Sequence, residues 1–296
     1  MPELVVISGK GGTGKTSLVA SFAVLARQLV LADCDVDAAD LHLVLEPRVH
    51  RREAFTGGKK ARIKPGHCTA CGKCEELCRF EAIFFDGPGN GPVPRTFRIE
   101  PSACEGCGVC VHFCQEKAIE FNPSVDGEWY VSETRCGPMV HAQLHPGAGN
   151  SGKLVTLVRS EAQRISKQRG GSLTLVDGSP GIGCPVIASI TGASRILAVT
   201  EPTLSGEHDL DRVLRLARHF SLPTAVCVNK WTLNADIAER IEKRAGSDGA
   251  LILPRVPYDP AITEAQRKGV AVVELGDSPA SQAIRQGWSV LCQNLS

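Results

Sequence analysis

The sequence predicts an α/β fold, a mainly parallel sheet flanked by helices, interrupted by a small inserted α+β domain. Short apolar runs alternate with stretches of helical spacing at both ends of the chain, which is typical of a parallel sheet. Between them, residues 65–122 hold eight cysteines and almost no helical periodicity. We therefore expect one domain formed by residues 1–58 and 128–296, and an inserted domain formed by residues 59–127.

Composition is that of an ordinary globular protein, because 43% of the 296 residues are hydrophobic and 22% are charged. The net charge of +1 gives no overall attraction to nucleic acid or anionic membranes. Neither a signal-peptide pattern nor a run of about 18 apolar residues occurs. We expect a cytoplasmic protein with no nucleic-acid partner and no stable membrane insertion. In that reducing compartment, grouped cysteines indicate metal more often than disulfides.

The first α/β segment is predicted as strand, glycine-rich loop, helix and strand. Residues 4–7 form a buried-strand run, residues 17–29 have helical spacing, and residues 30–32 predict a second strand. Residues 48–64 are rich in lysine and arginine and contain two adjacent glycines. We expect this stretch to be a solvated boundary segment, and a nucleic-acid-binding arm is the alternative.

The α/β pattern returns after the cysteine-rich region. Residues 129–131 predict a returning strand, and further strands and helices follow from about residue 153. The closing helix carries an apolar stripe that suits core packing better than membrane docking, because few basic residues surround it. The expected strands are 173–176, 196–199, 225–228 and 251–253, the expected helices are 206–219, 234–245 and 279–294, and the stripe is Ile284, Trp288 and Leu291.

Residues 9–16 (GKGGTGKT) fit the phosphate-loop pattern G-x-x-x-x-G-K-[ST]. Glycines let backbone N–H groups surround phosphate oxygens, Lys15 reaches the β- and γ-phosphates, and Thr16 offers its hydroxyl to Mg²⁺. A plain glycine-rich turn is the alternative, but the flanking strand and helix favour a P-loop NTPase that binds ATP and Mg²⁺. The nucleotide-binding candidates here are Gly9, Lys10, Gly11, Gly12, Thr13, Gly14, Lys15 and Thr16.

Lys10, near the start of the loop, is the informative departure from the general pattern. A second lysine here resembles the deviant Walker A form of the MinD/ParA/Mrp and nitrogenase iron-protein class. The resemblance implies that Lys10 reaches across a dimer to the partner's nucleotide, so we expect a homodimer or a heterodimer with a paralogous ATPase. A surface lysine without this role is the alternative.

The same resemblance assigns further site residues. It implies that Asp35 orients or activates the attacking water, which makes Lys10, Lys15 and Asp35 the catalytic candidates. Asp33 is expected to contact the Mg²⁺ shell or the loop, although both aspartates suit a plain strand-end role. Asp177 follows an apolar strand, which favours a second, water-mediated Mg²⁺ contact. Asn229 is expected to contact adenine, with the loop around Pro257 closing over the base.

The cysteine-rich region is an internal repeat with C-x₂-C-x₂-C-x₃-C spacing in both copies. This is the spacing of bacterial two-cluster ferredoxins, in which the fourth cysteine binds the other cluster. Zinc fits poorly, because its sites use pairs of ligands rather than runs of three. We expect a 2[4Fe–4S] ferredoxin-like domain with one [4Fe–4S] cluster on Cys68, Cys71, Cys74 and Cys114, and the other on Cys104, Cys107, Cys110 and Cys78.

Two departures accompany the repeat. Arg79 and Gln115 stand where a proline normally follows the fourth cysteine. Proline is not a ligand, so ligation is expected to survive, and we hypothesise that the charge of Arg79 raises the potential of the nearby cluster.

Five cysteines lie outside the repeat. Cys34 and Cys227 sit in strand patterns and are expected in the core. Cys184 has the offset of the cysteine that binds a dimer-bridging cluster in the nitrogenase iron protein, but no second ligand is evident, so a packing or metal-handling cysteine is the alternative. Cys136, with His141 and His145, forms either a metal or partner site or an ordinary return from the insert.

Taken over nearly the whole chain, the sequence resembles MinD-superfamily P-loop ATPases with an inserted ferredoxin domain. The resemblance implies an ATP-driven dimer switch that gates electron transfer to a redox partner or a small metallocofactor-binding protein, in metallocofactor or iron–sulfur assembly or a related redox complex. The alternatives are a positioning or scaffold ATPase with structural clusters, and an iron–sulfur cluster carrier.

Overall fold

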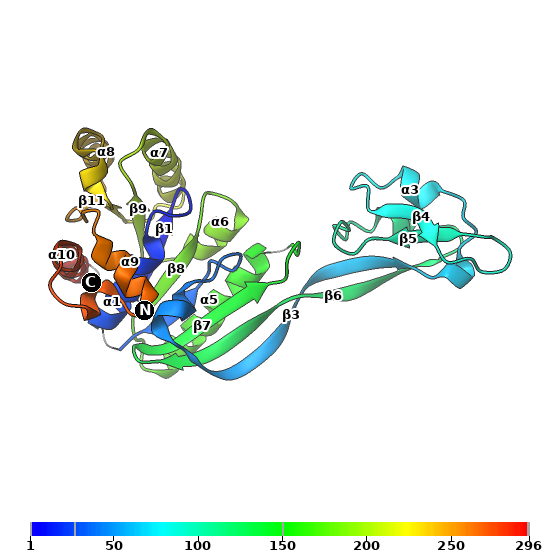
Figure 1. Cartoon of the computed structure of the whole chain (residues 1–296), viewed down its shortest axis with the longest axis horizontal. Helices are drawn as coiled ribbons and strands as arrows, with labels where there is room; N and C mark the ends of the chain where they lie inside the picture. Colours follow the sequence, from blue (N-terminus) through cyan, green and yellow to red (C-terminus); the bar gives the residue numbers. More distant parts are fainter. Residues whose placement is uncertain (1, 27, 150, 295–296) are drawn as a thin grey trace. The chain divides into compact units, whose positions relative to one another are not determined.

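A computed structural model describes residues 2–26, 28–149 and 151–294 (Figure 1). The chain divides into two compact units, and each has its own core. The first unit comprises Met1–Glu53, Trp129–Gln143 and Ser151–Ser296, and the second comprises Ala54–Glu128 and Leu144–Asn150. The chain thus enters the second unit from the first and returns to it.

Within the described residues, one sheet contains nine strands in the order β11-β10-β9-β1-β8-β2-β7-β6-β3. The pairings from β11 through β7 are parallel, which confirms the predicted α/β class. Strand β8 runs past Asp177 to Pro180, so the predicted strand end at Asp177 was wrong by three residues. The strands are β1 (Glu3–Ser8), β2 (Val30–Asp33), β3 (Arg48–Ile63), β6 (Ile119–Thr134), β7 (Gly137–Leu144), β8 (Thr174–Pro180), β9 (Arg195–Thr200), β10 (Thr224–Val228) and β11 (Leu251–Ile252).

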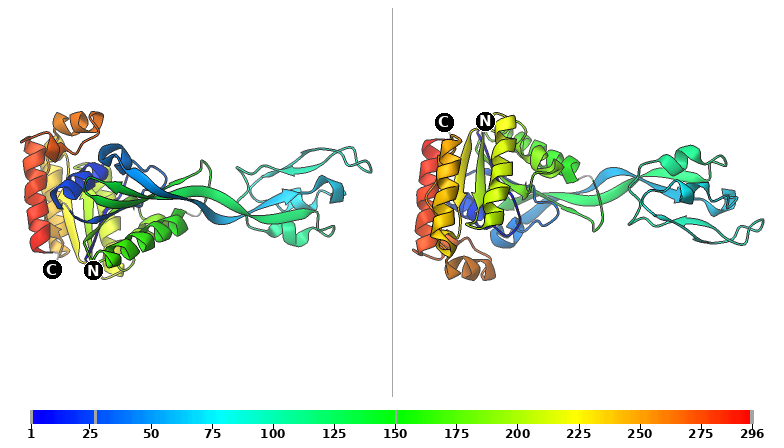
Figure 2. Two further views of the ribbon diagram at one scale, coloured as in Figure 1. Left: turned by 90° about the horizontal axis from the view of Figure 1, so that it is seen from below. Right: turned by 90° about the horizontal axis from the view of Figure 1, so that it is seen from above.

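Helices flank both faces of the parallel part of this sheet (Figure 2). Several begin at a side chain that accepts a backbone N–H, such as Thr203 before α7 and Asn234 before α8. The stripe of α10 is core, as predicted, since Ile284 and Leu291 are buried and the Trp288 ring lies 5.2 Å from that of Phe22. The helices are α1 (Lys15–Ala26), α2 (Leu41–Leu45), α5 (Ser151–Gln168), α6 (Cys184–Ile190), α7 (Leu204–His219), α8 (Ala235–Ser247), α9 (Pro260–Arg267) and α10 (Pro279–Gln293), with the 3₁₀ turns η2 (Trp231–Leu233) and η3 (Val272–Glu274).

Strand β3 corrects the expectation that residues 48–64 are a solvated boundary segment. The stretch is a 16-residue strand that pairs with β6, whose 16 residues include the predicted returning strand 129–131. Most side chains of β3 are exposed, and its first seven are exposed without interruption, so this half of the strand lacks the alternation that marks a half-buried strand. Pairing of its backbone, and contacts such as Arg51 over the Trp129 ring at 4.7 Å, give this basic stretch its structure.

The second unit is built from short elements. Strand β4 (Ile83–Gly87) pairs antiparallel with β5 (Thr96–Ile99), and the helices are α3 (Lys73–Glu76), α4 (Val109–Phe113) and the 3₁₀ turn η1 (Pro65–His67). Gly72 (φ 82°) and Gly108 (φ 76°) precede α3 and α4 in the left-handed region, where glycine is least strained. The two copies of the sequence repeat therefore start their helices with the same turn. Over the part of the chain that the structure describes, no helix is long and apolar enough to cross a membrane.

Candidate functional site

The phosphate loop lies between β1 and α1, as the sequence predicts. It lines a hollow of about 420 Å³ at the carboxyl edge of the parallel strands in the first unit. The loop after β2, the end of β8 and the start of α6 contribute the other walls, together with one residue of α9. The lining residues are Ser8, Gly11, Gly12, Thr13, Gly14, Lys15, Thr16, Ser17, Asp35, Asp37, Ala38, Asp40, Ser179, Pro180, Pro185 and Gln266.

Lys15 is buried among carboxylates at the start of α1. Its Nζ forms a short ion pair with Oδ1 of Asp177, and it lies 3.6 Å from Oδ2 of Asp35. Burial by itself lowers the pKa of Lys15, but the charges of Asp177 and Asp35 outweigh it and raise the pKa. The ammonium group therefore stays protonated beside the hollow, as a lysine that binds the β- and γ-phosphates must.

Asp33 and Asp177 are register neighbours on β2 and β8. Asp33 is fully buried, and its oxygens accept from the N–H groups of Asp35 at 3.2 Å and Leu41 at 3.4 Å. Both contacts lie in the segment that follows β2, so Asp33 shapes that segment, and its expected contact with the Mg²⁺ shell or the phosphate loop stays a prediction. Burial, with the charge of Asp177, raises the pKa of Asp33 well above its ordinary range.

Asp35 lines the hollow. Burial, with the charge of Asp177, raises the pKa of Asp35 to about 6 against the opposing effect of Lys15. Nearby, Oδ2 of Asp177 and Oγ1 of Thr13 are buried without a hydrogen-bond partner among the residues that the structure describes. Buried polar groups normally have partners, so these atoms fit a site that takes an Mg²⁺–nucleotide with its bound water.

Lys10 does not line this hollow. Its Nζ pairs with Oε1 of Glu201 at 2.6 Å and donates to Oγ of Ser205 at 2.9 Å. The second oxygen of Glu201 lies 3.3 Å from Nζ of Lys230, which also donates to the carbonyl of Gly12 at 2.8 Å. Burial alone would raise the pKa of Glu201, but the two lysines outweigh it and lower the pKa. Sequence reasoning missed Glu201. The available signal was its position directly after β9, since Asp35 likewise follows the end of a parallel strand, β2.

Asn229 holds the phosphate loop from the end of β10. It is buried, its Nδ2 donates to the carbonyl of Thr13 at 2.7 Å, and its Oδ1 accepts from the N–H of Lys230 at 2.9 Å. A Cβ at Gly14 (φ 86°) would stand 2.2 Å from that Nδ2, so only glycine fits there. Val256 forms a parallel bridge with Asn229, which brings the loop that begins with Pro257 to the same strand end.

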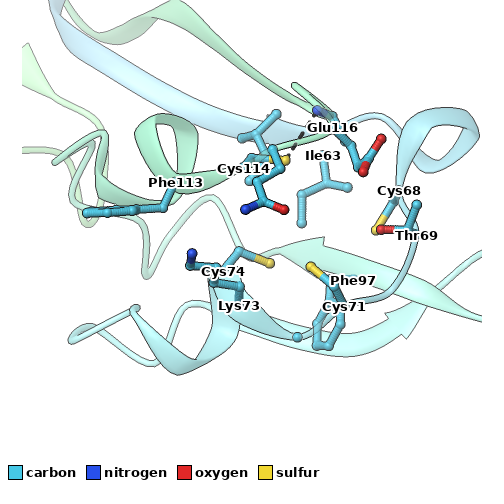
Figure 3. A pocket seen from close by; sticks show the side chains of 14 residues that line it. Ile63, Cys68, Thr69, Cys71, Lys73, Cys74, Phe97, Phe113, Cys114 and Glu116 are labelled. Carbon is cyan, nitrogen blue, oxygen red and sulfur yellow. Dashed lines mark hydrogen bonds between the residues drawn. The ribbon is translucent and has the colours of Figure 1, made fainter.

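The repeat cysteines line two hollows in the second unit. Cys68, Cys71, Cys74 and Cys114 line the first, and Figure 3 shows all four sulfur atoms turned toward it. Cys78, Cys104, Cys107 and Cys110 line the second. Each hollow thus takes three cysteines from one run and the fourth from the other, the grouping that the sequence predicts.

No three His, Cys, Asp or Glu side chains converge on a single point among the described residues. In a [4Fe–4S] cluster the four cysteines bind different irons, so its ligands surround a volume rather than one ion. None of the eight repeat cysteines forms a disulfide. The donor set and its grouping therefore fit the cubane clusters better than a mononuclear metal.

The remaining cysteines have plainer surroundings. Cys34 and Cys227 are buried in the core, as predicted, while Cys184 is exposed at the start of α6. Cys136 is buried, and Nε2 of His141 lies 2.8 Å from Oγ of Ser132. Within the described ranges, Cys136, His141 and His145 do not gather around one ion.

A phosphate loop at the carboxyl edge of a parallel sheet, with its lysine buried against a carboxylate, defines a P-loop nucleotide-binding protein. The family model described as "CobQ/CobB/MinD/ParA nucleotide binding domain" matches residues 4–272. The chain belongs to this family of nucleotide-binding ATPases.

Relatives and solved structures agree with this assignment. An uncharacterised protein of Methanocaldococcus jannaschii is 32% identical over 236 residues, which cover 78% of this chain and 79% of the relative. The MinD of the MinC:MinD cell division complex of Aquifex aeolicus superposes with a TM-score of 0.58 at 19% identity, covering 99% of this chain and 96% of that one. MinD of Pyrococcus horikoshii, solved with Mg-ADP, has a TM-score of 0.58 at 18% identity, covering 100% and 98%. At these identities the two structures establish the shared fold.

Proposed function

We propose that this protein binds and hydrolyses ATP as a dimer switch, and that the switch controls electron transfer through two [4Fe–4S] clusters in the second unit. One observation carries the proposal. A single chain combines a P-loop site in its first unit with two hollows, each lined by four exchanged cysteines, in its second. The proposed task is metallocofactor or iron–sulfur assembly, or a related reductive reaction.

The charges around the phosphate loop support the ATPase part of the proposal. Lys15 binds the β- and γ-phosphates, which replace the carboxylates now paired with it. Thr16 and Asp177 would hold Mg²⁺, with the buried Oδ2 of Asp177 as an available acceptor. Asp35 orients the attacking water from the wall of the hollow. Lys10 reaches the nucleotide of the partner subunit, as its place in the loop suggests.

The eight repeat cysteines support the electron-transfer part of the proposal. When bound, the clusters supply one-electron transfer without bond making in the protein. The thiolates of each hollow hold one cluster, and the backbone N–H of Ala118 donates to Sγ of Cys114 at 3.3 Å. Hydrogen bonds to cluster sulfurs and ligands tune the potential, so this contact belongs to the electron-transfer site.

A packed route inside the first unit supports coupling between the two halves. The loop that carries Asp35 is tied through Asp33 to the N–H of Leu41, where α2 begins. The ring of His42 on α2 stacks on that of His141 in β7, with centroids 6.4 Å apart, and His141 stacks on Tyr130 of β6 at 4.9 Å. Strand β6 continues into the second unit. A shift of the Asp35 loop on ATP binding thereby changes the packing of a strand that leads to the cysteines.

The test uses the full chain, purified without oxygen and reduced with dithionite. We expect about eight irons per chain, an EPR signal from two [4Fe–4S] clusters, and reduction kinetics that change when ATP–Mg²⁺ is added. A Lys15→Ala variant serves as the control, since it keeps the clusters and loses the ATP effect. Identical kinetics with ATP, ADP and no nucleotide would falsify the coupling, and clusters that do not respond to reductant would favour the scaffold ATPase.

A further inference from the structure

We propose that Glu201 holds Lys10 within its own subunit in the absence of nucleotide, and so sets how readily ATP drives dimer formation. Glu201 is then a positioning residue that acts through Lys10. The inference rests on the proposed dimer switch, because it concerns the lysine that would cross to the partner's nucleotide.

The contacts of Lys10 place its ammonium group in a complete site on its own chain. Nζ lies 2.6 Å from Oε1 of Glu201, 2.9 Å from Oγ of Ser205 and 3.4 Å from Oγ1 of Thr203. The Lys10 side chain is 31% exposed and that of Glu201 is 15% exposed. A lysine held in this way is not free to extend to a second subunit until these contacts break.

The charge of Glu201 is what makes this site acceptable to a cation. Thr203 caps α7, accepting from the N–H of Gly206 at 3.0 Å, and Ser205 lies in the first turn of the helix. The positive end of a helix dipole disfavours a cation. Without the carboxylate, Lys10 would face that helix end with only two hydroxyl groups as partners, and its release would become easier.

Lys230, which also pairs with Glu201, lowers the free-energy cost of releasing Lys10. Oε2 of Glu201 lies 3.3 Å from Nζ of Lys230, which also donates to the carbonyl of Gly12 in the phosphate loop. When Lys10 leaves, Glu201 retains Lys230 and is not stranded as an unpaired, partly buried charge. The arrangement therefore holds Lys10 firmly enough to oppose dimer formation without ATP, and weakly enough for ATP binding to reverse it.

The experiment compares Glu201→Gln with Glu207→Gln in the full chain. Glu207 is a matched control, since it lies on α7 and pairs with Arg240 rather than Lys10. Sedimentation of the monomer and dimer is measured across a titration of a non-hydrolysable ATP analogue with Mg²⁺. Loss of a partly exposed ion pair in each subunit is expected to lower the dimer dissociation constant about tenfold in Glu201→Gln. Glu207→Gln should behave as the parent protein.

A second measurement reads Lys10 directly. The acylation rate of Lys10 in the nucleotide-free protein, measured by mass spectrometry against the exposed Lys243, is expected to rise several-fold in Glu201→Gln. If that variant folds poorly, Ser205→Ala removes one partner of Lys10 and should shift both readouts in the same direction by less. Unchanged dimer formation and unchanged Lys10 acylation would overturn the proposal.

A Lys10→Ala variant distinguishes a failure of the proposed dimer switch from a failure of the inference about Glu201. It should prevent dimer formation, and Glu201→Gln should then have no further effect in that background. Dimers that form normally in Lys10→Ala would contradict the dimer role of Lys10 in the proposed function. Loss of dimers in Lys10→Ala, with parent-like behaviour in Glu201→Gln, would remove only the inference about Glu201.

Discussion

The nucleotide-binding unit and the cysteine module, here residues Ala54–Glu128 and Leu144–Asn150, obtain their structure by different means. Among the described residues, one core cluster of the first unit joins 28 buried apolar side chains, whereas that of the module joins eight. A core of eight side chains rarely stabilises a domain unaided. The first unit therefore holds its site by packing, and we expect the module to depend on the clusters that its cysteines would bind.

The two units should differ most in stability when the clusters cannot form. Replacing all eight repeat cysteines with serine should abolish amide protection across the module, while the first unit keeps its protection and its ATP binding. The reason is that cluster binding supplies the folding free energy that the small core lacks. Hydrogen exchange resolved by peptide, together with iron analysis, checks this.

Protected amides in β4 and β5 of that variant would show that the small core suffices. The same iron analysis tests Cys184, since zero residual iron removes the hypothesis of a cluster there.

The next largest effect concerns the buried charges of the first unit. Lys15→Ala leaves Asp177 without its ion-pair partner, and breaking such a buried pair costs about 3 kcal/mol. The free energy of unfolding of the first unit should fall accordingly, with ATP binding lost. Denaturant unfolding can be followed by tryptophan fluorescence, because Trp129, Trp231 and Trp288 all lie in this unit.

The exposed Lys243→Ala is the matched control for this experiment. The iron content of the module should not change in either variant. An unfolding midpoint equal to that of the parent would mean that Asp177 needs no counter-charge.

A smaller effect is expected from His141, which is buried within β7. Burial, with the charge of His42, lowers the pKa of His141 from an ordinary value of 6.5 to about 4. The unfolded chain then binds the proton more readily, so stability is lost as the pH falls from about 6.5 toward 4. Between pH 7.5 and pH 5 the loss is about 2 kcal/mol.

His141→Gln should remove this dependence and can still bond to Ser132. Comparing the pH dependence of the two proteins cancels the contributions of the buried aspartates. A variant that loses as much stability between these pH values as the parent would exclude His141 as the source.

The smallest effect concerns Arg79, beside Cys78 in the module. Its side chain is exposed, so water screens its charge. Arg79→Ala should lower the potential of the nearby cluster by about 20 mV in redox titrations. An unchanged midpoint would remove the hypothesis that Arg79 raises the potential.

The parts that sequence reasoning predicted well are those in which the chemistry is local. The phosphate loop is a run of eight residues between a strand and a helix, and its spacing alone allows Lys15 and Thr16 to be assigned. Strand β3 escaped prediction, because a strand whose faces are mostly exposed carries no hydrophobic period. What identifies it is pairing with β6, a partner distant in the chain.

By itself, the sequence determined which residue types are available: a phosphate loop, its carboxylates and two runs of four cysteines. Only the tertiary structure decided which of them meet. The contact between Lys10 and Glu201 joins positions 191 residues apart, since the ends of β1 and β9 lie side by side in a parallel sheet. Strand order is set by packing across the whole domain, so no local pattern around either residue reveals it.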